Sequence, residues 1–285
     1  MKFVELGSNS VRVPRLGLGT WRFGESARSR AAEVAAVRHA LEIGYRLIDT
    51  AEMYGDGGAE EVVGQALADV IASGEVRRDE VFVVTKVLPQ HASARGAERA
   101  FAASRRRLRI DTVDLYLLHW RGGVPLAETI SAFERLQESG ALRFWGVSNF
   151  DASDMDELWA LSGGPGCVAN QVYYSASHRG IEYDLLPWQR ARGVRTMAYC
   201  PIDQGTLASN QALTRLAAER GVTSAQLALA WSMRSGDVIA IPKAGRREHL
   251  RDNLAAAEVE LDGTLRERID HAFPPPRRKQ PLAMT

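Results

Sequence analysis

The chain has 285 residues, of which 45% are hydrophobic and 25% are charged, a balance typical of a soluble globular protein with a sizeable core. The 36 Lys and Arg residues against 35 Asp and Glu residues give a formal net charge of +1, so no overall field favours nucleic acid or an anionic membrane as partner. The N-terminal residues lack an apolar run of signal-peptide length, and no stretch of about 18 apolar residues occurs anywhere. We therefore expect a cytoplasmic protein.

In chain order, two short strands come first, at residues 2–6 and 11–14, around the turn formers Gly7, Ser8 and Asn9, and they predict an N-terminal β-hairpin. From there, eight short apolar runs alternate with stretches of helical periodicity. The predicted strands are residues 16–19, 47–49, 81–84, 115–118, 144–147, 168–172, 194–199 and 238–241. The predicted helices are residues 31–43, 59–72, 97–108, 126–138, 152–161, 185–191, 210–220 and 224–233.

Eight consecutive strand–helix units whose strands are apolar on both faces indicate a parallel sheet buried inside helices. We predict a (β/α)₈ TIM barrel, with the N-terminal hairpin and a single domain over residues 1–285, because no Pro/Gly/Ser-rich linker divides the chain. An open doubly wound sheet is the alternative, but the fingerprint GxGxxG follows none of the predicted strands. Its nearest match, Gly17-Leu-Gly19, lacks the third glycine.

Polar residues that close apolar strands are the candidates for chemistry, because barrel active sites lie at the C-terminal ends of the strands. Asp49 ends the second strand, Tyr54 follows in its loop, Lys86 ends the third strand and His119 ends the fourth. Taken one at a time, each has an ordinary structural interpretation: the aspartate as a helix cap, the tyrosine as a loop aromatic, the lysine as a solvated strand end and the histidine as a core residue. Together they predict one site, because a lysine held at the barrel mouth needs a partner such as Asp49.

A metal site is not expected. The chain has only two cysteines, Cys167 and Cys200, without CxxC spacing, and they read as free thiols. A barrel metallohydrolase would also place Asp, His and Lys at strand ends, but six histidines with no HxH at a strand end make a dinuclear site hard to build.

Six sequence blocks resemble the aldo-keto reductase family in order and spacing. They are Gly17-Leu-Gly-Thr-Trp21, Asp49-Thr-Ala-Glu-Met-Tyr-Gly55, Thr85-Lys86, Asp114-Leu-Tyr-Leu-Leu-His119, Gly146-Val-Ser-Asn-Phe150 and Ile241-Pro-Lys243. Within the family, residues 179–187 and the segment after Phe273 look like those of bacterial methylglyoxal reductases. The resemblance thus covers nearly the whole chain.

The resemblance implies NADPH-dependent reduction of small aldehydes and ketones, such as methylglyoxal and related 2-oxoaldehydes, to alcohols, a reaction of carbonyl detoxification. Tyr54 would give the proton, Lys86 would lower the pKa of Tyr54, and Asp49 would keep Lys86 charged. His119 would hold the carbonyl oxygen. Some relatives that reduce carbon–carbon double bonds carry a glutamate at the position of His119, so the histidine indicates carbonyl reduction.

The resemblance also implies the cofactor contacts of NADP(H). Ser148, Asn149 and Gln171 would bind the nicotinamide carboxamide, and Tyr199, which could equally be a core aromatic, would stack on the ring. The remaining implied cofactor positions are Gly19, Thr20, Trp21, Asp49, Cys200, Pro201, Ile202, Gly205, Ile241, Lys243, Ala244, Gly245, Arg246, His249, Asp252 and Asn253.

A cluster of cations follows the last strand and precedes a further helix. Lys243, Arg246 and Arg247 there read either as a solvated charge run or as an anion site for the adenosine 2′-phosphate. His249 stands where an arginine often contacts that phosphate, and Cys200 replaces a serine near the pyrophosphate. The strength of a preference for NADPH over NADH therefore stays open.

The substrate pocket is expected around Trp21, Met53, Tyr54, His119 and Trp120. Residues 273–285, the C-terminal segment, follow a helix that ends near Ala272 and are expected to add little wall to this pocket. We expect a monomer whose partner is a small carbonyl substrate, with neither nucleic acid nor membrane. The alternative within the same family is a nucleotide-sensing regulatory subunit with little turnover.

Overall fold

The computed structural model describes residues 2–7 and 11–285, so the predicted turn residues Ser8 and Asn9 lie outside the described residues. Eight parallel strands, β3 to β10, pair in chain order. Their bounds are β3 (Leu18–Gly19), β4 (Leu47–Asp49), β5 (Phe82–Val87), β6 (Val113–Leu118), β7 (Leu142–Ser148), β8 (Cys167–Tyr173), β9 (Arg195–Tyr199) and β10 (Val238–Ala240).

The first and last strands of this sheet meet and close it into a barrel. Leu16 and Gly19 form parallel bridges with Ala240 and Lys243, and the Gly19 amide donates to the Pro242 carbonyl at 3.0 Å. A side chain at position 19 would not fit this closure, because a Cβ there would lie 2.7 Å from the Ile241 carbonyl oxygen. The predicted TIM barrel is confirmed, and Gly17-Leu-Gly19 belongs to its closure.

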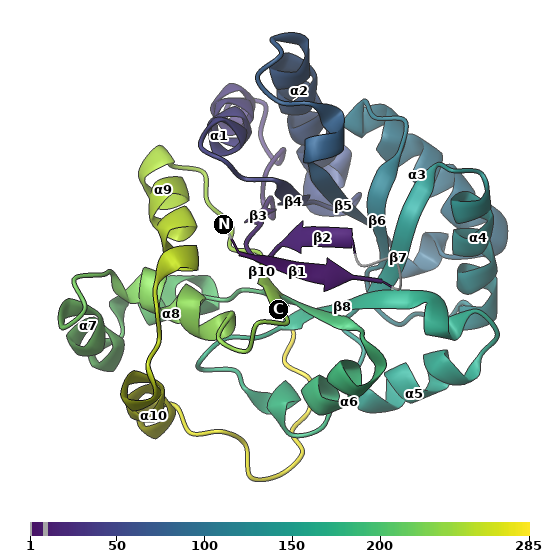
Figure 1. The fold of residues 1–285 in the computed structure, drawn as a ribbon. Helices are drawn as coiled ribbons and strands as arrows, with labels where there is room; N and C mark the ends of the chain where they lie inside the picture. The colour runs from purple at the N-terminus through teal and green to yellow at the C-terminus, as the bar shows by residue number, and fades with distance from the viewer. Residues whose placement is uncertain (1, 8–10) are drawn as a thin grey trace.

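Helices surround the barrel (Figure 1). They are α1 (Arg30–Glu42), α2 (Gly58–Ala72), α3 (Ala94–Leu108), α4 (Leu126–Glu138), α5 (Ala152–Ala160), α6 (Leu185–Arg192), α7 (Gln211–Ala218), α8 (Ser224–Ser232), α9 (Arg247–Ala255) and α10 (Gly263–Ala272). Each predicted helix is present with bounds that differ by a few residues at most. Within the described ranges, no helix is long and apolar enough to cross a membrane.

The predicted hairpin is present as β1 (Phe3–Leu6) and β2 (Val11–Pro14), which pair antiparallel. It lies across the end of the barrel that faces the viewer in Figure 1. Its side chains Val4, Leu6 and Val13 are buried against the apolar residues that fill the barrel interior, such as Leu115 and Met197. The hairpin thus closes one end of the barrel, and the strand C-termini open at the other end.

The third barrel strand extends further than its sequence predicts. Strand β5 continues through Thr85 and Lys86 to Val87, where Lys86 pairs with Leu117 of β6. The polar pair Thr85-Lys86 ends the apolar run in the sequence, yet both residues are fully buried. Lys86 consequently lies inside the strand, where it pairs with Leu117 of β6 on one side and its carbonyl accepts a hydrogen bond from the Glu52 amide on the other.

Candidate active site

The structure brings together the four polar residues predicted at the strand ends. Asp49 closes β4, Tyr54 begins a 3₁₀ turn (Tyr54–Gly57), Lys86 lies in β5 and His119 follows β6. Asp49, Tyr54 and His119 line a cavity of about 680 Å³ at this end of the barrel. Lys86 has no exposed surface and meets the others through hydrogen bonds.

The Lys86 ammonium is the centre of the group. It donates to Asp49 Oδ2 at 2.8 Å, to the Thr50 carbonyl at 2.9 Å and to the Tyr54 hydroxyl at 3.1 Å. All three ammonium protons therefore have an acceptor. The other oxygen of Asp49 accepts a 2.7 Å hydrogen bond from Gln171 of β8, which ties the pair to the opposite side of the barrel.

Tyr54 is oriented by an unusual stretch of backbone. Gly55, Asp56 and Gly57 have φ of 57°, 52° and 86°, in the left-handed region that glycine and aspartate tolerate best. A Cβ at position 55 would also lie 2.7 Å from the Phe23 carbonyl oxygen. The glycines of the Tyr-Gly-Asp-Gly sequence thus allow a tight turn that presents Tyr54 to Lys86 and then starts α2.

Burial and the charge of Lys86 determine the protonation of the site. Burial lowers the pKa of Lys86, but Asp49 and Tyr54 outweigh it and raise that pKa above its ordinary value. Burial raises the pKa of Tyr54 more than Lys86 lowers it. This result corrects the expectation of a lowered tyrosine pKa, because the desolvation of the phenolate outweighs the charge of the neighbouring ammonium.

His119 is held neutral. Burial, and then the nearby charge of Lys86, place the pKa of His119 well below 6.5. Its Nδ1 is buried without a hydrogen-bond partner among the described residues. The ring lies edge-on to Tyr54, with 5.7 Å between the ring centroids. Tyr54 and His119 therefore offer two uncharged polar groups to the same part of the cavity.

Most of the predicted cofactor residues line the same cavity. The Tyr199 hydroxyl donates to Asn149 Oδ1 at 2.8 Å, and the Ser148 hydroxyl donates to the Gln171 carbonyl at 2.9 Å. The predicted cofactor positions on the cavity wall are Gly19, Trp21, Asp49, Ser148, Asn149, Gln171, Tyr199, Cys200, Pro201, Ile202, Gly205, Ile241, Lys243, His249, Asp252 and Asn253. The predicted substrate residues Trp21, Met53, Tyr54, His119 and Trp120 line it too.

Four predicted cofactor residues do not line the cavity: Thr20, Ala244, Gly245 and Arg246. Thr20 is buried and its hydroxyl donates to the Asp49 carbonyl, so it supports the site from behind. Arg246 is exposed, and its guanidinium contacts His249 Nε2 at 2.5 Å. Adjacency in sequence cannot separate residues that face the cavity from their neighbours that face away.

The cavity has further lining residues that the sequence did not indicate: Arg22, Gln204, Ala208, Ala225, Pro242, Met284 and Thr285. Met284 and Thr285 correct the expectation that the C-terminal segment adds little wall. Thirteen residues rich in proline span up to roughly 40 Å when extended, at about 3.1 Å per residue. In Figure 1 the yellow segment leaves α10, passes α6 and returns towards the middle of the barrel.

Among the described residues, no group of three or more His, Cys, Asp or Glu side chains lies together in a way that could hold a metal ion. The polar groups of the cavity instead consist of one buried cation, its carboxylate, a phenol, an imidazole and several amides and hydroxyls. This set suits an uncharged substrate on which negative charge develops during reaction.

Residues 15–273 match the aldo/keto reductase family. The chain is 46% identical over 282 residues to methylglyoxal reductase YeaE of Escherichia coli K12, with 97% of each chain covered. It is 33% identical to methylglyoxal reductase DkgB of Salmonella typhimurium, over 88% of this chain and 90% of the relative. A crystal structure of an aldo-keto reductase from Klebsiella pneumoniae in complex with NADPH superposes with a TM-score of 0.94 at 47% identity, over 100% and 99% of the two chains. The chain therefore belongs to the aldo/keto reductase family and is an oxidoreductase.

Burial of His119 makes the stability of the protein depend on pH. In the unfolded chain a histidine binds a proton below about pH 6.5, whereas folded His119 takes one only at much lower pH. The free energy of unfolding should thus fall by up to about 1.4 kcal/mol per pH unit below about pH 6.5 on account of this residue. We expect His119→Asn to lose stability less steeply than the wild type in denaturant titrations between about pH 6.5 and 5.

His271→Asn, which replaces an exposed histidine of α10, is the control and should follow the wild type. Equal slopes for the wild type and His119→Asn would contradict the buried, neutral state of His119.

Proposed function

We propose that this protein reduces small aldehydes and ketones to alcohols with NADPH, and that 2-oxoaldehydes such as methylglyoxal are its preferred substrates. The observation that carries the proposal is the Tyr54 hydroxyl, 3.1 Å from a buried ammonium and beside neutral His119 on the cavity wall. The names of the relatives agree with it: two are methylglyoxal reductases, and one reductase was crystallised with NADPH.

Tyr54 acts as the general acid in this proposal. When bound, NADPH would supply hydride to the carbonyl carbon, and negative charge would develop on the carbonyl oxygen. Tyr54 gives its proton to that oxygen, and Lys86 stabilises the phenolate that remains, because its ammonium donates to the phenol oxygen. The raised pKa of Tyr54 keeps the proton in place at neutral pH until the oxygen becomes basic.

His119 and Asp49 have positioning roles in the same step. A neutral imidazole can donate one hydrogen bond to the carbonyl oxygen without adding charge to the site, and the low pKa of His119 keeps it in that form. Asp49, held by Gln171, fixes the Lys86 ammonium and balances its charge. The reacting oxygen therefore meets two donors in fixed positions.

The residues of the cavity fit NADP(H). Amide and hydroxyl groups of Ser148, Asn149 and Gln171 can bind a carboxamide, and the Tyr199 ring offers a flat face beside them. Lys243 and His249 line the cavity near the N-terminus of α9, where a cation and the helix dipole favour a phosphate. The cavity of about 680 Å³ provides one continuous space for both ends of the cofactor.

Replacing the acid should separate binding from chemistry. We expect Tyr54→Phe to lose roughly 10²-fold or more in kcat, with the Kd for NADPH unchanged, because the phenyl ring keeps the cavity wall and loses only the proton. Stopped-flow turnover and fluorescence titration with NADPH measure the two quantities. A kcat near that of the wild type in Tyr54→Phe would rule out Tyr54 as the acid.

The cations after β10 should favour NADPH over NADH. Charge-assisted hydrogen bonds from Lys243, and from Arg246 or Arg247, to the 2′-phosphate predict that advantage, and rising salt should reduce it. Lys243→Met should lower kcat/KM for NADPH roughly tenfold and leave kcat/KM for NADH unchanged, since NADH lacks the phosphate. Equal kcat/KM for the two cofactors at low ionic strength would overturn the assignment.

Substrate size and carbonyl reactivity should set specificity. The pocket near Tyr54 is bounded by Trp21, Met53 and Trp120 and also by Met284 and Thr285, and we infer that these walls favour small substrates over large ring systems. An electron-poor 2-oxoaldehyde accepts hydride readily and needs less binding energy than an unactivated ketone. We expect methylglyoxal and nitrobenzaldehyde to exceed glucose and a 3-ketosteroid in kcat/KM, measured by loss of NADPH absorbance. A tenfold lead for the steroid or for glucose would refute this assignment.

A further inference from the structure

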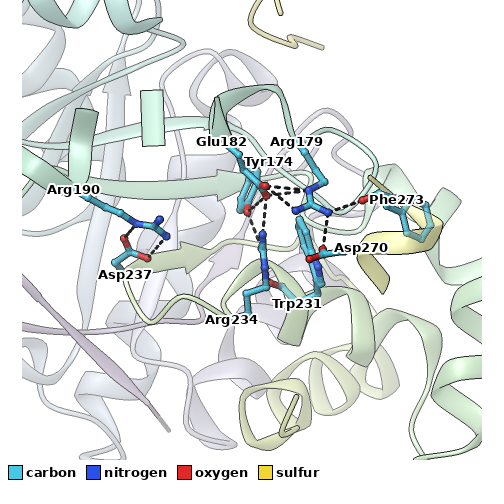
Figure 2. A network of polar contacts seen from close by, with 9 residues as sticks. All are labelled: Tyr174, Arg179, Glu182, Arg190, Trp231, Arg234, Asp237, Asp270 and Phe273. Atoms are coloured by element: carbon cyan, nitrogen blue, oxygen red, sulfur yellow. Dashed lines mark hydrogen bonds and ion pairs between the residues drawn. The ribbon is translucent and has the colours of Figure 1, made fainter. Parts of the chain in front are cut away.

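A cluster of polar side chains joins the loop after β8 to α8, α10 and the C-terminal segment (Figure 2). Glu182 is its hub: it accepts hydrogen bonds from Arg179 Nη2 at 2.8 Å, from Arg234 Nη2 at 2.7 Å and from the Tyr174 hydroxyl at 2.6 Å. Both guanidinium groups also lie near the ring of buried Trp231, at 4.9 Å for Arg179 and 3.6 Å for Arg234. Two members of the cluster, Arg179 and Glu182, belong to residues 179–187, which supply none of the catalytic residues.

Arg179 connects this cluster to the C-terminal segment. Its side chain is only 6% exposed, and Nη1 donates to Asp270 Oδ1 at 2.7 Å and to the Phe273 carbonyl. Phe273 directly follows α10, so Arg179 binds one of the carbonyls that the end of a helix leaves unpaired. The direction in which the chain leaves α10 is therefore fixed by one guanidinium.

The segment then runs along the loop that contains Arg179. A Cβ on Gly180 would lie 3.2 Å from Gln280 Oε1, and Lys279 Nζ lies 3.4 Å from Asp184 Oδ2. Leu282 packs against the hydrophobic core. The prolines at positions 274–276 restrict φ, so a direction set at Phe273 is carried along an extended, stiff stretch.

The far end of the segment reaches the candidate active site. Met284 and Thr285 line the cavity together with Tyr54 and His119. Thr285 also lies beside Tyr199: burial raises the pKa of that phenol, and the side chain and backbone of Thr285 act to lower it. One end of the segment is thus held by the Arg179 cluster, and its other end forms part of the wall beside the proposed nicotinamide and substrate positions.

We propose that Arg179 is a positioning residue for substrate: by holding Asp270 and Phe273, it directs the C-terminal segment so that Met284 and Thr285 narrow the cavity around small carbonyl compounds. The proposal rests on the proposed reductase function. A buried group of charges contributes little net stability compared with apolar residues of the same volume. We therefore assign the Arg179 cluster the role of fixing the position of the C-terminal segment, rather than that of raising the stability of the fold.

Hydrogen–deuterium exchange of the cofactor-free protein tests the tether without any turnover. We expect the peptide over residues 277–285 to exchange roughly tenfold faster in Arg179→Met than in the wild type, because the segment leaves its position more often. Arg190→Met is the matched control: it removes an arginine beside the cluster whose hydrogen bonds go to Asp237 (Figure 2), and it should exchange like the wild type. Equal exchange in the wild type and Arg179→Met would overturn the proposal.

Steady-state kinetics of three variants test the effect of Arg179 on KM for the substrate. They are Arg179→Met, a chain without residues 274–285, and that truncated chain with Arg179→Met. We expect Arg179→Met to raise KM for methylglyoxal about fivefold with kcat within about twofold, and to leave KM for a bulky aromatic aldehyde unchanged or lower. Added to the truncated chain, the same substitution should change KM no further, because its effect passes through the segment. A full additional effect in the truncated chain would overturn the proposal and indicate a general structural role.

Lys279→Met provides a second test that does not depend on a buried arginine, since Lys279 is half-exposed. Lys279→Met should increase both the exchange rate of residues 277–285 and the KM for methylglyoxal, but by less than Arg179→Met does. No change in either quantity would count against a segment held along this loop. A wild-type protein that reduces no carbonyl with NADPH would refute the proposed function, whereas active wild type with additive kinetics would refute only the role of Arg179.

Discussion

The buried ion pair of Lys86 and Asp49 is the interaction on which the site depends. Two charges with 0% and 2% exposure have lost their hydration, and such a loss is tolerated only when every remaining donor and acceptor is satisfied. Three groups supply the remaining hydrogen bonds of the pair: Thr50 beside β4, Tyr54 in the following turn and Gln171 across the barrel. Because Gln171 belongs to β8, the pair is complete only when the barrel is closed.

The same pair helps to explain why Tyr54 and His119, the two groups that face the cavity beside it, are both uncharged. Burial lowers the pKa of His119, and the positive charge of Lys86 lowers it further, so the imidazole stays neutral. Towards Tyr54 the two charges act in opposite senses, Lys86 lowering and Asp49 raising the pKa, so burial decides the direction. A charged pair that is nearly neutral as a whole thus leaves both neighbours uncharged, and a neutral phenol and a neutral imidazole each keep one proton that they can donate in a hydrogen bond.

The sequence predicts features that depend on local interactions better than features that depend on contacts between distant segments. The barrel and its helices follow from local periodicity, and Asp49, Lys86 and His119 could be located because each interrupts an apolar strand. The predicted third strand, residues 81–84, stops before Thr85, whereas β5 continues to Val87. The Thr85 hydroxyl in fact donates to buried Glu60, which is also bound by Arg107, a network between α2, β5 and α3. Only the packed structure shows such a partner.

The C-terminal segment shows the same limit for the pocket. The small number of residues in this segment predicts a small contribution to the cavity wall. The distance that a chain spans also depends on its extension per residue, however, and a proline-rich chain is nearly fully extended. Where such a segment ends depends on its anchor, and here the anchor, Arg179, lies 94 residues before its acceptor Phe273 in sequence. The barrel strands thus fix the groups for chemistry, while contacts outside the barrel fix a wall of the cavity. Among the described residues, the catalytic group and the Arg179 cluster make their side-chain hydrogen bonds to different partners, so changes in one can occur without disturbing the other.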